Sequence, residues 1–518
     1  MTGDRKDDYA GMLDRLAAQR EAALGMGGAA RLQRRREAGV LNARERLDRL
    51  LDPGSFRELG LFATSERSET WERTPADGKI AGFGHIDGRP VFVAANDFTV
   101  MGASSSPTNM RKLAHMKRLA AERGQPVIWL GESSGARIPD MMGAKGMASS
   151  GQDPQQYTRY RESPWVSGVL GNCFGSSTWY ACLSDFVVMR KGAVLAVAGP
   201  RVTGGAIAET VDPEDLGGWR LHAEETGLAD QIVDTDEEAM AAIRRFLSYL
   251  PGNAEAAPPR GDPDAEAGQP GEALLDIVPV NRGRVYDMRK LVAAVVDRDS
   301  FFPLKPRYGK AVVTGLARLA GRSVGIVASN PMVKGGALDP DACSKVTSFL
   351  VLCDSFNIPL VFLVDTPGFL VGREGERKRA PGRIMNYMQA LQMCSVPKIA
   401  LVIRKLYGQA YLNFGGGRNS DVIGAWPGAE ISFMDPELAV RVVHGDGLQV
   451  DDPQRYRAEL AAFHADASAE AMARLYAVQE IVDPRQTRSW LAGALDGLMG
   501  GADGIVSRHR LGGWPTTL

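Results

Sequence analysis

Hydrophobic and polar positions follow two different patterns along the chain. Between residues 4 and 50, apolar residues recur at helical spacing among charged ones, and the sequence DPG at 52–54 is a stop signal for a helix. Short runs of consecutive apolar residues follow, at 91–95 (VFVAA) and 127–130 (VIWL). Such runs are typical of buried strands in a parallel sheet. The pattern predicts a helical N-terminal segment followed by alternating strands and helices.

The same order of elements returns in the second half of the chain. Apolar runs at 324–329 (VGIVAS) and 360–364 (LVFLV) flank a segment for which the spacing predicts a helix. Its apolar stripe consists of Ala342, Val346, Phe349, Leu350, Cys353 and Phe356. In both halves the second apolar run ends in a turn that contains glycine, ESSGAR at 132–137 and DTPGFL at 365–370. This alternation predicts an α/β fold with a parallel sheet, in which ligands bind at the carboxyl ends of the strands.

Corresponding segments of the two halves are related by one constant offset in residue number, which is 233. The pairs at this offset are Gly88 and Gly321, Pro126 and Pro359, Gly135 and Gly368, and Gly175 and Gly408. Four pairs at one offset indicate an internal duplication. Residues 251–272 are rich in Pro, Gly, Ala and acidic residues and lack an apolar period, which predicts a linker. We therefore expect two related domains, residues 1–250 and residues 273–518.

Composition and charge are those of an ordinary globular protein. Of the 518 residues, 44% are hydrophobic, and 61 basic residues balance 62 acidic ones. The net charge of −1 creates no field that attracts nucleic acid or an acidic membrane. No run of 18 apolar residues and no secretory signal is present, so we expect no membrane span and a cytoplasmic location. The five cysteines lack CxxC spacing, which predicts free buried thiols in a reducing compartment and no metal site.

The glycine turns are the strongest candidates for chemistry. A turn after a buried strand can direct backbone N–H groups at an oxygen atom and stabilise negative charge there, as an oxyanion hole does. Each half offers two such turns, at 134–136 and 175–177 in the first half and at 367–369 and 408–410 in the second. Two turns in each half predict one oxyanion hole per half. Taken alone, any one of these glycines is better explained as a tight strand–helix connection.

Other patterns give weaker signals. The glycines at 415–417 lack the frame of a nucleotide-binding loop, and Ser133 and Ser134 lack that of a serine hydrolase. The six histidines are scattered without metal-ligand spacing. A basic run at 373–383 predicts a solvated face, or alternatively a contact with phosphates.

Longer motifs are spread over nearly the whole chain. They are LNARERLDRLLDPGSF (41–56), GHIDGRPVFVAANDFTVMGAS (84–104), SSGARI (133–138), YDMRKLV (286–292), VDTPGFLVG (364–372) and RKLYGQAY (404–411). Together they resemble the carboxyltransferase (β) subunit of biotin-dependent acyl-CoA carboxylases of the propionyl-CoA and methylcrotonyl-CoA type. The resemblance implies two tandem crotonase-like domains, each a spiral of ββα units. It also implies a homohexamer, a trimer of dimers with active sites at dimer interfaces.

The resemblance further implies an activity. A carboxyl group would pass from carboxybiotin to the α or vinylogous carbon of an acyl-CoA, through enolates held in two oxyanion holes. The N-terminal domain would bind the acyl-CoA and the C-terminal domain biotin. No Ala-Met-Lys-Met motif is present to carry biotin, so the biotin carboxylase and biotin carrier are expected on separate chains.

The family's functional residues can be placed on this sequence by motif. The donors of the first hole fall on Ser134 and Gly135, and those of the second on Gln409 and Ala410. Further residues expected at the ligands are Ala136, Gly175, Ser176, Gly368, Phe369, Gly408, Tyr411 and Leu412. Ser134, Ser176 and Gln409 stand where the family usually has glycine. Two alternatives stay open, a biotin-dependent acyl-CoA decarboxylase component and a non-catalytic CoA-binding paralogue, and so does the acyl group.

Overall fold

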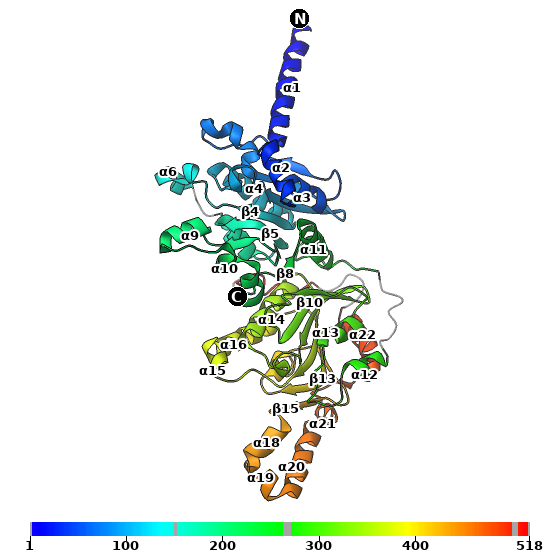
Figure 1. The fold of residues 1–518 in the computed structure, drawn as a ribbon. Helices are drawn as coiled ribbons and strands as arrows, with labels where there is room; N and C mark the ends of the chain where they lie inside the picture. Colours follow the sequence, from blue (N-terminus) through cyan, green and yellow to red (C-terminus); the bar gives the residue numbers. More distant parts are fainter. Residues whose placement is uncertain (1–2, 150–152, 263–270, 500–505, 516–518) are drawn as a thin grey trace. The chain divides into compact units, whose positions relative to one another are not determined.

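The computed structural model describes residues 3–149, 153–262, 271–499 and 506–515 (Figure 1). Contacts within the chain divide it into two compact units. Of the described residues, unit 1 comprises those up to residue 247 together with Pro515, and unit 2 comprises those from 248 to 514.

Unit 1 is built on an eight-stranded sheet of order β1-β2-β3-β4-β5-β6-β8, with β7 paired to the end of β5. The strands are β1 (Arg57–Leu59), β2 (Lys79–Ile86), β3 (Arg89–Asn96), β4 (Val127–Ser133), β5 (Trp165–Phe174), β6 (Phe186–Arg190), β7 (Val194–Ala196) and β8 (Gln231–Val233). The first three pair antiparallel, and all later pairs from β3 onward are parallel. The carboxyl ends of the parallel strands therefore lie at one edge of the sheet.

Unit 2 repeats this sheet, with the order β16-β14-β13-β12-β11-β10-β9 and with β15 paired to β13. The strands are β9 (Phe302–Leu304), β10 (Val312–Leu319), β11 (Arg322–Ser329), β12 (Leu360–Thr366), β13 (Lys398–Tyr407), β14 (Val422–Ala425), β15 (Glu430–Ser432) and β16 (Glu480–Ile481). Strand directions also match those of unit 1. Because the first residues of β10 to β13 follow those of β2 to β5 at the offset of 233, the predicted duplication is confirmed.

Helices cover both sheets. Those of unit 1 are α1 (Gly3–Leu24), α2 (Ala29–Glu37), α3 (Ala43–Leu50), α4 (Pro107–Arg123), α5 (Ile138–Met141), α6 (Gly143–Ser149), α7 (Pro154–Tyr157), α8 (Ser176–Leu183), α9 (Pro200–Ile207), α10 (Pro213–Gly217) and α11 (Asp236–Tyr249), which extends past the unit boundary. Those of unit 2 are α12 (Ala273–Ile277), α13 (Met288–Val295), α14 (Pro340–Ser355), α15 (Arg373–Arg377), α16 (Ala380–Met393), α17 (Ala410–Asn413), α18 (Pro436–His444), α19 (Leu448–Asp451), α20 (Pro453–Asp466), α21 (Ala469–Arg474) and α22 (Thr487–Leu498).

The N-terminal segment is helical and stops before residues 52–54, as predicted, but it is divided into three helices. Gly28 and Gly39 adopt positive φ, of 91° and 65°, which interrupts the helix on both sides of α2. Gly27 lies so close to Thr99 that a Cβ atom on Gly27 would be 2.2 Å from the Thr99 carbonyl oxygen. The break is therefore set by a tertiary contact as well as by local glycines.

Duplicated turns and helices support the two sheets in the same way. The β2–β3 and β10–β11 hairpins turn through Asp87-Gly88 and Ala320-Gly321, all four at positive φ, as a two-residue type I′ turn requires. The whole predicted apolar stripe is buried, on α14 up to Cys353 and at Phe356, the residue that caps the helix.

Of the expected linker, residues 251–272, the structure describes residues 251–262 and 271–272. The Asn357 side-chain amide donates to the carbonyls of Ala254 and Ala256, at 2.8 and 2.7 Å, and Arg318 donates to that of Pro259 at 2.9 Å. These hydrogen bonds hold the segment against unit 2.

Candidate functional site

Two glycine turns meet at the carboxyl ends of β4 and β5. Residues 134–136 follow β4, and Gly175 follows β5. Gly135 and Gly175 have φ of 99° and 66°. A Cβ atom on Gly175 would lie 3.6 Å from the Cα atom of Gly135, so the two turns are in contact. The structure thus joins the two segments that the sequence predicted to form the first hole.

In the first turn, hydrogen bonds distinguish engaged N–H groups from available ones. The Ser134 N–H donates to the Gly102 carbonyl at 2.9 Å, and the Gly135 N–H donates to Ser133 Oγ at 3.2 Å. Ser105 pairs with Ala136 in a parallel bridge, in which the hydrogen bonds run between Ser105 and the residues on either side of Ala136. In a parallel bridge the central residue directs its own N–H to the opposite side. The Ala136 N–H therefore points away from Ser105, and none of the described residues accepts it.

The N-terminal end of helix α8 adds two donors. The N–H groups of Thr178 and Trp179 donate to the Gly175 carbonyl, at 3.0 and 3.4 Å. Those of Ser176 and Ser177 have no hydrogen-bond acceptor in the part of the chain that the structure describes. N–H groups without an acceptor at a helix N-terminus attract negative charge. Unit 1 thus presents three N–H donors that can bind an oxyanion.

Unit 2 reproduces the first turn. The Gly368 N–H donates to Thr366 Oγ1 at 3.2 Å, as Gly135 does to Ser133, and Pro367 has no N–H. Leu338 bridges Phe369 as Ser105 bridges Ala136. The Phe369 N–H has no acceptor among the described residues.

The second turn of unit 2 follows β13. The Tyr411 N–H donates to the Gly408 carbonyl at 3.0 Å, whereas those of Gln409 and Ala410 have no acceptor in the described ranges. Gln409 has a φ of −58° and an exposed side chain. The donors Phe369, Gln409 and Ala410 therefore correspond to Ala136, Ser176 and Ser177.

Tyr411 and Leu412, predicted to contact the ligands, lie on α17 against the glycines at 415–417. A Cβ atom on Gly416 would lie 2.4 Å from the Tyr411 ring, and one on Gly417 would lie 2.5 Å from Leu412 Cδ2. The triple glycine, which fits no nucleotide-binding frame, therefore makes room for these two side chains.

A buried carboxylate precedes the first turn of each unit, and sequence reasoning missed both. Glu132 accepts from Arg35 at 2.7 and 3.0 Å and from Arg46 at 2.7 Å. Asp365 accepts from Arg404 Nε at 2.8 Å. Burial acts to raise the pKa of Glu132, but the charges and hydrogen bonds of Arg46 and Arg35 outweigh it and lower the pKa. The offset of 233, which relates Glu132 to Asp365, would have found them.

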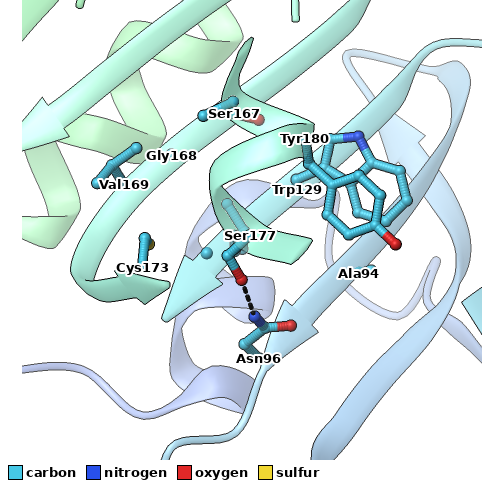
Figure 2. A pocket seen from close by; sticks show the side chains of 12 residues that line it. Ala94, Asn96, Trp129, Ser167, Gly168, Val169, Cys173, Ser177 and Tyr180 are labelled. Carbon is cyan, nitrogen blue, oxygen red and sulfur yellow. Dashed lines mark hydrogen bonds between the residues drawn. The ribbon is translucent and has the colours of Figure 1, made fainter. Parts of the chain in front are cut away.

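A small cavity lies between α8 and strands β3, β4 and β5 (Figure 2). The Tyr180 and Trp129 rings stack at 4.0 Å, and Asn96 Nδ2 donates to Ser177 Oγ at 3.2 Å. Both contacts hold α8 on the sheet and so fix its N-terminus at the first turn. Cys173 also lines the cavity, where burial raises the pKa of its thiol to about 12, which argues against a nucleophilic thiolate.

The prediction that the cysteines are free thiols is confirmed, but one of them is not buried. All five cysteines are free, four of them buried and Cys182 partly exposed. Across the described ranges, no three His, Cys, Asp or Glu side chains are placed to hold a metal ion. None of the helices in those ranges has the length and hydrophobicity needed to span a membrane.

Exposed apolar side chains flank both sets of donors. Those of the unit 1 rim are Ile138, Val197, Val202 and Ile207, and those of the unit 2 rim are Val371, Phe433, Leu438 and Val443. The two rims correspond position by position, the first pair at the offset of 233 and the other three at 236. Val371 and Phe433 are 88% and 82% exposed. Clusters of this kind mark surfaces that another molecule covers.

Comparison with known proteins identifies related chains. Residues 34–496 match the family described as the carboxyl transferase domain. The propionyl-CoA carboxylase carboxyltransferase subunit of Haloferax mediterranei is 37% identical over 491 residues, which cover 92% of this chain and 94% of that protein. The methylmalonyl-CoA decarboxylase subunit alpha of Veillonella parvula is 33% identical over 476 residues, with coverages of 90% and 92%.

A solved structure is similar over almost the whole chain. The transcarboxylase 12S structure, described as a hexamer with methylmalonyl-coenzyme A and methylmalonic acid bound, has a TM-score of 0.88 and 32% identity. The match covers 95% of this chain and 98% of that one. The family resemblance, the fold of two similar α/β units and the carboxyl transfer activity expected from the motifs are confirmed.

Proposed function

The chain belongs to the carboxyl transferase family, and from this we propose that it is the carboxyltransferase subunit of a biotin-dependent carboxylase that acts on propionyl-CoA or a similarly short acyl-CoA. One observation carries the proposal beyond the family assignment. Two equivalent sets of three N–H groups without an acceptor among the described residues, one in each unit, lie at the carboxyl ends of the central strands. Carboxyl transfer between two enolates needs two such sets, because negative charge develops on two oxygen atoms.

The acyl-CoA domain of this proposal is residues 1–250. The N–H groups of Ala136, Ser176 and Ser177 hold the thioester oxygen, on which charge develops when the α-proton leaves. Ser134 and Gly135, whose own N–H groups are engaged, shape the turn together with Gly175. In this assignment the donor role passes from Ser134 and Gly135 to Ala136 in the same turn. Ser176 and Ser177, at the start of α8, supply the other two N–H groups.

The biotin domain is residues 273–518. A ureido group has one carbonyl oxygen that gains negative charge, and the N–H groups of Phe369, Gln409 and Ala410 fit such an acceptor. Biotin, when bound on its carrier, supplies the carboxyl group and the base, so this chain provides position and electrostatic stabilisation. Gly368 and Gly408 keep the turns open, and Leu412 contributes to the choice of acyl chain.

We also propose a cytoplasmic homohexamer, built as a trimer of dimers and served by a separate biotin carboxylase and biotin carrier. The unit 1 rim of one subunit would cover the unit 2 rim of its partner, which brings the two sets of donors to one active site. Val371→Glu tests this arrangement, because its side chain is 88% exposed and the change leaves the subunit core intact. We expect the variant to sediment as a smaller species without activity. A hexamer of unchanged stability would contradict the proposed interface.

A second function has one specific observation in its favour, the similarity to the Veillonella decarboxylase subunit. The same two sets of donors would stabilise the enolates of decarboxylation. A membrane protein that co-purifies with the chain would favour this alternative. The non-catalytic CoA-binding paralogue is less well supported, because both sets of donors are intact.

The deciding experiment is purification of the tagged chain from its own host, followed by detection with streptavidin and a panel of acyl-CoA thioesters. A co-purifying biotinylated chain, together with ATP-dependent carboxylation of a short acyl-CoA, is the expected result. A folded oligomer that binds CoA but has no biotinylated partner and no transfer activity would refute the proposal.

A further inference from the structure

A pair of serine hydroxyls joins the two segments of the first hole. Ser105 Oγ and Ser176 Oγ lie 3.0 Å apart. Ser105 is buried and bridges Ala136, whereas Ser176 is partly exposed and carries one of the available N–H groups. The pair therefore connects the backbone segment that carries the Ala136 N–H to helix α8, which carries the N–H groups of Ser176 and Ser177.

The pair has a proton to donate. Two hydroxyls carry two protons, and one hydrogen bond between them uses only one. The neighbouring hydroxyls of Ser133 and Ser134 differ, because they donate to the carbonyls of Ala103 and Gly102, at 3.1 and 3.2 Å. Apart from the bond between them, neither Ser105 Oγ nor Ser176 Oγ has a partner in the described part of the chain. One O–H is therefore available to an acceptor in the hole.

The fold itself does not require this pair. At the offset of 233, the corresponding residues are Leu338 and Gln409, which occupy the same places beside the second hole without hydroxyl groups. The hydroxyl pair is consequently a feature of unit 1 alone. That asymmetry links it to the ligand of the first hole.

We propose that the Ser105–Ser176 pair is an additional hydrogen-bond donor to the thioester oxygen of the acyl-CoA, which makes Ser176 a catalytic residue and Ser105 its positioning residue. The inference rests on the proposed function. The Ser105 hydroxyl donates to Ser176 Oγ, and the Ser176 proton is directed at the substrate oxygen without being transferred. Hydrogen bonds to an ionised oxygen are stronger than those to a neutral one, so the pair favours the enolate over the bound thioester.

The test uses the complete carboxylase with propionyl-CoA and the variants Ser176→Ala, Ser105→Ala and Ser176→Thr. We expect Ser176→Ala to lower kcat about tenfold or more with KM nearly unchanged, because a transition-state donor is lost. Ser105→Ala should give a smaller loss, and Ser176→Thr should restore most of kcat. In parallel, infrared difference spectra of bound propionyl-CoA with a ¹³C-labelled carbonyl report the hydrogen bonds to that oxygen. We expect a smaller carbonyl shift in Ser176→Ala than in the wild type.

A matched control exists at the other end of the same helix. Ser184 caps the C-terminus of α8; its Oγ lies 2.8 Å from Ser167 Oγ on β5 and donates to the Tyr180 carbonyl. Ser184→Ala therefore also removes one hydroxyl of a serine pair, away from the turns. This variant should keep wild-type kcat and carbonyl frequency. Equal losses in Ser176→Ala and Ser184→Ala, or wild-type behaviour of Ser176→Ala, would overturn the proposal. If the wild-type complex carboxylates no acyl-CoA, the proposed function fails, and the spectra of the bound thioester still test the hydroxyl pair.

Discussion

Replacing Gln409 with proline deletes one donor of the proposed second hole with little change to its surroundings. Proline removes the N–H and fixes φ near −65°, and Gln409 already has a φ of −58°. Its N–H makes no hydrogen bond with any described residue, and the residue before it is Gly408, which tolerates the restriction that a following proline imposes. The fold should therefore retain its stability.

The expected effect on catalysis is large. Loss of one oxyanion-hole donor raises a barrier by about 2.7–4 kcal/mol, which lowers the rate roughly 10²- to 10³-fold. Gln409→Ala is the matched variant, because it truncates the exposed side chain and keeps the N–H. We expect the alanine variant to retain most activity and the proline variant to lose it.

The assay is transfer of the carboxyl group from methylmalonyl-CoA to free biotin, followed by chromatography of the CoA thioesters. Affinity for propionyl-CoA, measured separately, should be equal in both variants because that ligand is proposed to bind unit 1. Thermal unfolding of both variants confirms that they are folded. Similar transfer rates in Gln409→Pro and Gln409→Ala would refute the assignment of this N–H to the second hole.

Two further predictions concern the buried ionisable groups. Glu132→Gln should destabilise the folded state by about 3–5 kcal/mol, because Arg35 and Arg46 lose their shared charge partner. Because the folded pKa of Glu132 is lowered, its contribution to stability is present above the ordinary glutamate pKa of about 4.3 and is lost as pH falls through the folded pKa. In denaturant unfolding between pH 3 and pH 6, the free energy of unfolding should therefore fall less steeply with decreasing pH in Glu132→Gln than in the wild type. Equal slopes in the two proteins would contradict this account. Burial lowers the pKa of Lys345 to about 7, and its side-chain nitrogen lies 2.7 Å from the Val312 carbonyl. Between about pH 7 and pH 10.4 the unfolded chain binds a proton that the folded chain does not, so stability rises with pH by up to about 1.4 kcal/mol per unit. Lys345→Met should reduce that rise in urea unfolding at pH 7 and pH 9, and an unchanged pH dependence would show that Lys345 is charged in the folded state.

The sequence alone was enough to predict the architecture and the turns that make up the candidate sites. Apolar runs identified the central strands, and the constant offset of 233 identified the duplication that both sheets display. The glycine turns placed both sets of donors to within one or two positions. These features are readable because strand burial and positive φ depend on local residue type.

Tertiary structure decided which N–H groups are available. Every residue except proline carries the same N–H, so the sequence could not show that Ser134 donates to the distant Gly102 carbonyl while Ala136 has no acceptor among the described residues. The Ser105–Ser176 pair joins two separate segments of the chain and is equally invisible in the sequence. The break in the N-terminal helix at Gly27 also depends on a distant residue, Thr99. In each case the chemistry is set by a partner far away in the chain, which only the folded arrangement specifies.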